Sequence, residues 1–264
     1  MNLHLDGKTA LVTGSTAGIG YAIAQGLARE GAHVFVNGRA QRSVDKAVAG
    51  MKAHTPNARI EGVAADVSTK EGCQAIIHQL ATVDILVNNA GIFEPVPFEK
   101  ITDEDWSRFF ETNVLSGVRL SRHYLHGMRK KDWGRILFIS SESGINIPVE
   151  MIHYGMTKSA VIAIARGLAE SVAGTGVTVN SILPGPTASA GVDQMLETQA
   201  KEKGTSKEEA EKNFFKHDRP SSLLQRFATP EEVANLAVYV ASELSVATNG
   251  APLRVDGGVV RSAF

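Results

Sequence analysis

A tyrosine and a lysine four residues apart, Tyr154 and Lys158 in "HYGMTK" (residues 153–158), are the first candidates for chemistry. On a helix, residues at this spacing lie on one face. A free tyrosine has a pKa of about 10, so its phenol is a poor base and a reluctant acid at neutral pH. A neighbouring ammonium favours the phenolate and lowers that pKa, which suits proton exchange with a carbinol or carbonyl oxygen. Taken alone, the pair is more often a core tyrosine beside a solvated lysine.

A glycine-rich turn, "TGSTAGIG" (residues 13–20), follows an apolar run and opens a helical segment. We expect Gly14 to make the tight turn, Gly18 to let the backbone approach a phosphate, and Gly20 to let the helix pack against the sheet. The unpaired N–H groups at a helix N-terminus attract a pyrophosphate. The spacing is G-x-x-x-G-x-G, which differs from the common dinucleotide-binding pattern.

Short apolar runs alternate with longer segments of helical period along the whole chain. This alternation predicts an α/β fold, a doubly wound Rossmann-type parallel sheet of about seven strands with helices on both faces. The predicted strands cover 9–13, 33–37, 59–64, 83–88, 135–140, 177–183 and 252–256. The predicted helices lie around 18–30, 42–54, 69–80, 103–130, 154–173 and 229–243. Since we find no linker or repeat, we expect residues 1–264 to form a single domain.

One passage, residues 186–228, interrupts this rhythm. It starts with proline and small residues and continues into the charged run "ETQAKEKGTSKEEAEKNFFKHDR". A long insertion in a compact domain is often a lid over a site. A solvated helical excursion explains the charged part equally well, so both interpretations stay open.

Composition excludes several classes of function. The formal net charge is -1 and 43% of the residues are hydrophobic, so we expect a packed core and no nucleic-acid or membrane partner. The uncharged run 9–28 contains four glycines, which favours a strand, a turn and a helix over a membrane span. The only cysteine, Cys73, permits no internal disulfide, and we expect a cytoplasmic protein. No cluster has metal-ligand spacing, so we predict no catalytic metal.

The glycine turn, "NNAG" at 88–91 and Tyr-x-x-x-Lys at 154–158 together resemble the short-chain dehydrogenase/reductase family. Further motifs follow in order, namely "LPG" at 183–185, "TPEEVANLAVYVAS" at 229–242 and "VDGG" at 255–258. The resemblance implies an oxidoreductase that transfers a hydride between a nicotinamide cofactor and a small carbonyl or secondary alcohol substrate. It also implies a homotetramer. A nucleotide-binding regulator or scaffold that lost the chemistry is the alternative.

The resemblance implies four catalytic residues. Tyr154 would be the general acid/base, and Lys158 would also bond the nicotinamide ribose. Ser141 lies 13 residues before Tyr154 and would hold the substrate oxygen; Ser140 and Ser143 are neighbours, so this assignment depends on the spacing. Asn113 in "ETNVLSG" would support a water-linked proton path to the lysine. We expect His153, one position from the tyrosine, to point elsewhere and to be structural or part of the pocket rim.

The second strand ends without the acidic residue that usually binds the ribose 2′-OH of NAD. By resemblance, Gly38 occupies that position and Arg39 follows it. A guanidinium can bind a 2′-phosphate in its forked geometry, so we predict NADP(H). Alternatively, Arg39 stacks on adenine or faces water and NAD(H) is accepted.

The resemblance implies further cofactor contacts on four loops. The glycine turn contributes Gly14, Ser15, Thr16, Gly18, Ile19 and Gly20. Asp66 and Val67 would contact adenine, and Asn89, Ala90 and Gly91 the adenosine ribose. Pro184 and Gly185 would lie behind the nicotinamide, and Thr187 and Ser189 near its carboxamide and the phosphates. The substrate pocket would be bordered by 142–153, by the residues after Gly91 and by the 186–225 lid, which predicts moderately apolar walls.

Overall fold

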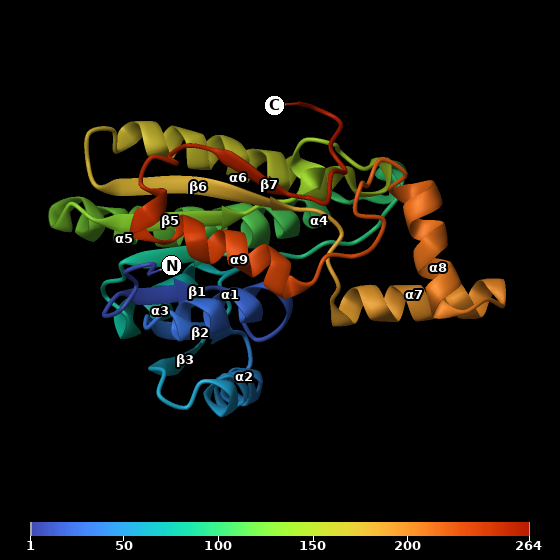
Figure 1. Ribbon diagram of the computed structural model, residues 1–264. Helices are drawn as coiled ribbons and strands as arrows, with labels where there is room; N and C mark the ends of the chain where they lie inside the picture. Colours follow the sequence, from blue (N-terminus) through green and yellow to red (C-terminus); the bar gives the residue numbers. More distant parts are fainter. Residues whose placement is uncertain (1, 264) are drawn as a thin grey trace.

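A computed structural model describes residues 2–263 and contains one seven-stranded parallel sheet (Figure 1). The strand order is β3-β2-β1-β4-β5-β6-β7. The strands are β1 (Thr9–Val12), β2 (His33–Gly38), β3 (Ile60–Ala64), β4 (Ile85–Asn88), β5 (Gly134–Ile139), β6 (Val177–Pro184) and β7 (Pro252–Val255). The order reverses between β1 and β4, and such a point opens a crevice at the carboxyl ends of the strands. The predicted fold class is confirmed.

Helices cover both faces of the sheet, and two apolar cores lie between helices and strands. The helices are α1 (Gly18–Arg29), α2 (Gln41–His54), α3 (Lys70–Gln79), α4 (Asp103–Phe110), α5 (Ser116–Lys131), α6 (Ile152–Ser171), α7 (Ala190–Lys203), α8 (Lys207–Asn213) and α9 (Pro230–Val240). One core joins α1, α2 and α9 to the strands, and the other joins α3, α5 and α6 to the opposite face.

The strands form where the sequence has continuous apolar runs, because most are buried on both faces. In β1, Ala10 pairs with Val34 of β2 and Ile85 of β4, and all three side chains are fully buried. Every predicted strand and helix is present, with ends that differ by a few residues. Because β1 pairs with β4, the turn between β1 and α1 lies next to the loop after β4 at the centre of the sheet.

The predicted helix over 103–130 is interrupted. Helix α4 starts at a capping box made by Thr102 and Asp105, and a π-helical turn, Glu111–Leu115, separates it from α5. Such a turn inserts an extra residue into the helical ladder and is frequent at functional sites. It contains Asn113, whose side chain it turns inward, where it is buried.

The charged segment forms a helical excursion that projects from the body at the right of Figure 1. Helices α7 and α8 and a π-helical turn, Phe214–Asp218, enclose a small apolar core of their own. Phe214 and Phe227 stack in it with ring centroids 5.0 Å apart. We call residues 186–228 the lid segment. The helical part of the prediction is confirmed, and closure over a site stays a prediction.

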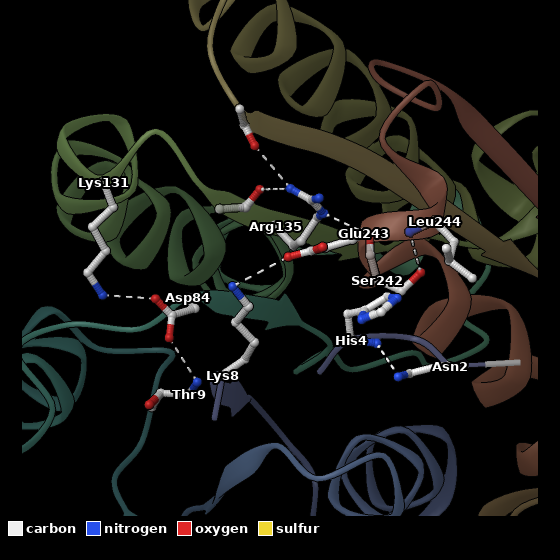
Figure 2. A network of polar contacts seen from close by, with 12 residues as sticks. Asn2, His4, Lys8, Thr9, Asp84, Lys131, Arg135, Ser242, Glu243 and Leu244 are labelled. Atoms are coloured by element: carbon white, nitrogen blue, oxygen red, sulfur yellow. Dashed lines mark hydrogen bonds and ion pairs between the residues drawn. The ribbon is translucent and has the colours of Figure 1, made fainter. Parts of the chain in front are cut away.

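At the amino ends of the strands, opposite the crevice, a buried arginine joins the starts of two strands (Figure 2). Arg135 donates to the carbonyls of Gly134, Gly176 and Ser242 at 2.8, 3.0 and 3.1 Å. Its guanidinium lies over the Trp133 ring, 4.5 Å from the centroid. These bonds link β5 to the start of β6 and to the turn that follows α9.

We predict that Arg135→Met lowers the free energy of unfolding by about 2–3 kcal/mol, because three buried carbonyls lose a charged donor. Urea unfolding followed by circular dichroism measures this. The control is Lys131→Met, which removes the half-exposed partner of Asp84 shown in Figure 2 and should cost less than about 1 kcal/mol. Equal losses in the two variants would contradict the structural role of Arg135.

Candidate active site

A cavity of about 470 Å³ opens at the carboxyl ends of β1, β2 and β4. Eight of the predicted cofactor residues line it: Gly14, Thr16, Arg39, Asp66, Val67, Asn89, Ala90 and Gly91. Sequence reasoning did not assign a contact to seven other lining residues: Asn37, Gly38, Ala65, Ser68, Ile92, Arg108 and Thr112. Polar groups at the ends of β1, β2, β3 and β4 thus converge at the reversal of strand order.

Helix α1 begins at the cavity without a side-chain cap. Its N-cap is Ala17, which has no side chain that could accept a hydrogen bond. Five other helices begin at a Thr or Ser whose hydroxyl accepts from the first turn: α3, α4, α7, α8 and α9. The first N–H groups of α1 therefore remain for an external acceptor, and an anion is the acceptor that a helix N-terminus favours.

The glycine turn is held against the end of β4 by a compact set of hydrogen bonds. Thr13 Oγ1 accepts from the N–H groups of Asn89 and Ala90 at 3.0 Å. The Asn89 amide donates to the carbonyls of Thr13 and Gly14 at 2.9 and 3.0 Å. A Cβ on Gly20 would lie 2.4 Å from that amide nitrogen, so the close approach requires glycine.

Ser15 belongs to the same glycine turn. It is fully buried, and its hydroxyl donates to the Val12 carbonyl and accepts from the Asn37 N–H. The Ser15 hydroxyl is therefore used within the turn, and contact of this residue with a cofactor stays a prediction.

At the end of β2, the cavity wall is formed by a residue without a side chain, Gly38, and a cationic residue, Arg39. A Cβ on Gly38 would lie 2.5 Å from the Thr16 methyl group, so this position has no room for an acidic side chain beside the turn. Arg39 follows, is exposed and lines the cavity. Asn37, which the sequence did not single out, donates from its amide to the Val63 and Ala65 carbonyls. It connects β2 to the β3 loop that carries Asp66.

Helix α6 is fixed to the end of β5 by its lysine. Lys158 is buried, and its Nζ donates to the Ile139 carbonyl at 2.9 Å. Ser140 Oγ donates to the Lys158 carbonyl at 2.7 Å. A Cβ on Gly91 would lie 3.4 Å from Lys158 Nζ and 3.3 Å from Asn113 Oδ1. Gly91 lines the cavity, so these two side chains lie directly behind its wall.

The three serines after β5 have distinct partners, which favours Ser141 beside the tyrosine. Ser140 bonds the Lys158 carbonyl, and Ser143 Oγ donates to Glu142 Oε1 at 3.2 Å. Of the three, Ser141 is the serine that acts on Tyr154 and lowers the pKa of its phenol. Spacing alone predicted Ser141, and its catalytic role stays a prediction.

Tyr154 is half-buried, and burial raises the pKa of its phenol to about 12. The Lys158 Nζ lies 5.5 Å from the centre of the phenol ring. Burial therefore outweighs the lowering by Ser141 and Arg219, and the protein's own groups do not bring the phenol pKa below its ordinary value. A lower phenol pKa with the oxidised cofactor bound stays a prediction. Burial also lowers the pKa of Lys158 to about 8, so the ammonium itself is weakened.

Asn113 connects three elements behind the cavity. Its Oδ1 accepts from the Ile92 N–H at 2.8 Å, and its Nδ2 donates to the Ile92 carbonyl and to Thr157 Oγ1 at 2.9 and 3.0 Å. The side chain thus holds the loop after Gly91 against α6. Its role in a water-linked proton path stays a prediction.

His153 is fully buried between the rings of Trp106 and Phe109, with no hydrogen-bond partner for either ring nitrogen. Burial lowers its pKa and keeps it neutral. The structural interpretation of this residue agrees with this position.

Several predicted contacts lie outside the cavity lining. Gly18, Ile19 and Gly20 start α1, and Tyr154 and Lys158 lie on α6. Pro184 ends β6, and Gly185 follows where a Cβ would lie 2.4 Å from the Asp256 carbonyl. Thr187 Oγ1 donates to the Gly185 carbonyl and Ser189 caps α7. Contact of these residues with a cofactor stays a prediction.

Comparison with known proteins gives the family. Residues 8–200 match the family model described as short chain dehydrogenase. The chain belongs to the short-chain dehydrogenase/reductase family. It is 49% identical to the oxidoreductase YvaG of Bacillus subtilis, over all of both chains. It is 35% identical to D-beta-hydroxybutyrate dehydrogenase of Cupriavidus necator, over 97% of this chain and 99% of the relative.

A solved structure has almost the same fold. L-sorbose reductase from Gluconobacter frateurii, complexed with NADPH and L-sorbose, superposes with a TM-score of 0.93 at 32% identity, over 99% of this chain and 100% of that one. The chain is therefore an oxidoreductase of this family. Within residues 2–263, no helix is long and apolar enough to cross a membrane. Those residues also contain no group of three or more His, Cys, Asp or Glu able to hold a metal ion.

The buried lysine predicts a pH-dependent stability. In the unfolded chain the Lys158 ammonium has a pKa of about 10.5. In the folded protein, burial lowers this pKa to about 8. Between these values the unfolded chain binds more protons, so stability rises with pH. Relative to Lys158→Met, the wild-type free energy of unfolding should gain up to about 3 kcal/mol from pH 8 to 10.5. Urea titrations of both proteins across this range test it, and a pH-independent difference would contradict it.

Proposed function

We propose that the protein is an NADP(H)-dependent oxidoreductase that interconverts a small carbonyl compound and a secondary alcohol. One observation carries this proposal: Lys158 lies directly behind the Gly91 wall of a cavity that suits a dinucleotide, with Tyr154 near it and Ser141 acting on the Tyr154 phenol. A catalytically silent regulator would not need this set, and nothing in the described site interrupts it.

The chain's own groups would position the substrate oxygen and exchange its proton. Ser141 and Tyr154 would both hydrogen-bond that oxygen, which fixes the reacting carbon relative to the cofactor. In reduction Tyr154 donates its proton to the forming alkoxide, and in oxidation it takes the proton of the carbinol. The bound cofactor supplies the hydride or accepts it and, when oxidised, carries a positive charge that favours the phenolate.

Lys158 and Asn113 would complete the catalytic set. Lys158 Nζ has one bond to the Ile139 carbonyl and retains two further donors for the nicotinamide ribose. Its depressed pKa, about 8, makes it able to exchange a proton near neutral pH. Asn113 stands beside it across Gly91, where it would hold the path by which Tyr154 is reprotonated.

Three features support NADP(H) over NAD(H). Gly38 leaves no space for an acidic ribose ligand, and Arg39 lines the cavity beside it. A forked guanidinium binds a phosphate more strongly than a ribose hydroxyl. In addition, the structural relative from Gluconobacter frateurii was solved with NADPH.

The substrate side of the site has an apolar rim. Phe93 lies 6.3 Å from Tyr154 between ring centroids and is 57% exposed. Other large apolar side chains are exposed on the loops that border the predicted substrate pocket: Ile145, Ile147, Val149, Leu223 and Leu224. A substrate with an apolar portion beside its carbonyl or carbinol group fits this surface. Acetoacetate, 3-oxoacyl thioesters, simple ketones and ketoses such as L-sorbose are the classes to assay.

We also propose a cytoplasmic homotetramer. The reduced, buried Cys73 is consistent with a reducing compartment. Tyr239, Leu244 and Val246 are exposed on α9 and on the turn that follows it, where a second copy would cover them. Light scattering on the purified protein tests the assembly, and a monomer would contradict it.

Tyr154→Phe removes the proton donor and keeps the ring. We predict that kcat falls at least about 10³-fold while the Kd for NADPH changes less than threefold. Stopped-flow assays and fluorescence titration measure the two quantities. Turnover within tenfold of the wild type would show that another group is the acid/base.

Arg39→Asp replaces the proposed phosphate ligand by a carboxylate. We predict that the ratio of NADPH to NADH affinity falls by about 10²-fold, since the carboxylate repels a 2′-phosphate and accepts from a 2′-OH. Arg42→Asp, an exposed site on α2 with the same change of charge, is the control. If the ratio changes equally in both variants, Arg39 has no specific role.

A further inference from the structure

A continuous set of polar contacts leads from the lid segment to the catalytic serine. Arg219 Nε donates to Glu142 Oε1 at 3.0 Å, across 77 positions of sequence. The same oxygen accepts from Ser143 Oγ at 3.2 Å, and the Ser143 N–H donates to Ser141 Oγ at 3.1 Å. Because Ser141 Oγ accepts this bond, its own hydrogen stays available for Tyr154 or a substrate oxygen.

The Glu142–Arg219 pair is buried, which separates it from the exposed ion pairs of the lid segment, Asp193–Lys207 and Arg226–Glu232. The side chains of Glu142 and Arg219 are 4% and 12% exposed, whereas those of Asp193 and Lys207 are 54% and 42% exposed. Glu142 Oε2 is buried without a hydrogen-bond partner. A buried pair of this kind adds little to stability, because desolvation offsets the attraction. Its position next to Ser141 therefore needs another explanation.

Both members of the pair also act on the catalytic phenol. Glu142 raises the pKa of Tyr154 and Arg219 lowers it. Burial raises the pKa of Glu142, and Asp256, on the loop after β7, raises it further; Glu150 lies 3.8 Å from Arg219. With Arg219 in place the two charges oppose each other at Tyr154. If the lid segment carried Arg219 away, an unpaired buried carboxylate would remain beside the phenol.

We propose that Glu142 and Arg219 are positioning residues that couple the seating of the lid segment to the catalytic serine and tyrosine. The inference rests on the proposed function of that site. Seated, the lid segment supplies the cation that neutralises Glu142 and, through Ser143, fixes the hydroxyl of Ser141. Lifted, it leaves Ser141 less fixed and Tyr154 harder to ionise, so proton transfer waits for the closed arrangement.

The test measures the pH at which Tyr154 ionises, by ultraviolet difference spectroscopy with and without NADP⁺. The direction in which this pH shifts in each variant decides the outcome. The Tyr154→Phe spectrum is subtracted to remove the signal of the other tyrosines. Glu142→Gln keeps the shape and removes the negative charge, so Tyr154 should ionise at lower pH, by roughly 0.5–1 unit. Arg219→Met leaves Glu142 unpaired, so Tyr154 should ionise at higher pH by a similar amount. The double variant should return close to the wild type.

The exposed Asp193–Lys207 pair of the same lid segment gives matched controls. Asp193→Asn and Lys207→Met repeat the two changes of charge away from Tyr154 and should leave its ionisation unchanged. Shifts in the same direction for Glu142→Gln and Arg219→Met, or no shift in either, would overturn the proposal. If Arg219→Met does not fold, Glu142→Gln alone decides, because an unchanged or higher ionisation pH in that variant contradicts the proposal.

Kinetics add an independent readout and separate the two proposals. With the best carbonyl substrate, both variants should lower kcat more than they raise KM, and the pH profile of kcat should move as the spectra do. A wild type without turnover would overturn the proposed function and leave the spectroscopic test standing. A wild type that turns over without the opposed shifts would overturn only the role of the pair.

Discussion

The site depends on one costly interaction, the burial of the Lys158 ammonium against the end of β5. Desolvation weakens that ammonium, and its bond to the Ile139 carbonyl holds α6 at a fixed height above the sheet. Ser140 adds a second bond from the same strand to the same helical turn. Tyr154, one turn earlier on α6, is thereby placed beside the Ser141 hydroxyl. A helix that could slide along the strand would lose this alignment.

The same point of the sheet also organises the cofactor side. The strand order reverses between β1 and β4, so the glycine turn and the loop at Gly91 lie together and are joined by Thr13 and Asn89. Behind Gly91 stand Lys158 and Asn113. The proposed cofactor site and the proposed catalytic residues therefore share one wall, and the uncapped start of α1 follows the turn that lines the same cavity. This shared wall explains why one fold supports both tasks.

The sequence alone predicted the features that depend on residues close together in the chain, such as the strands. Strands such as "TALVT" and "RILFIS" are buried on both faces, so their apolar runs are continuous and visible. Interactions between distant residues left no such pattern. Glu142 and Arg219 meet only after folding, Ser15 turns inward only once Asn37 is beside it, and the raised pKa of Tyr154 comes from burial. The π-helical turn at Asn113 was missed because the flanking segments both have helical period.

The most direct test of the central claim follows one atom. NADPH deuterated at the transferring C4 position is incubated with the protein and a panel of ketoses, 3-oxoacyl thioesters and simple ketones, and the alcohols are examined by mass spectrometry and NMR. The account predicts deuterium on the carbinol carbon of at least one product with the wild type, and none with Tyr154→Phe at the same NADPH saturation. Label transfer that survives in Tyr154→Phe, or NADPH binding without transfer to any carbonyl, would contradict it.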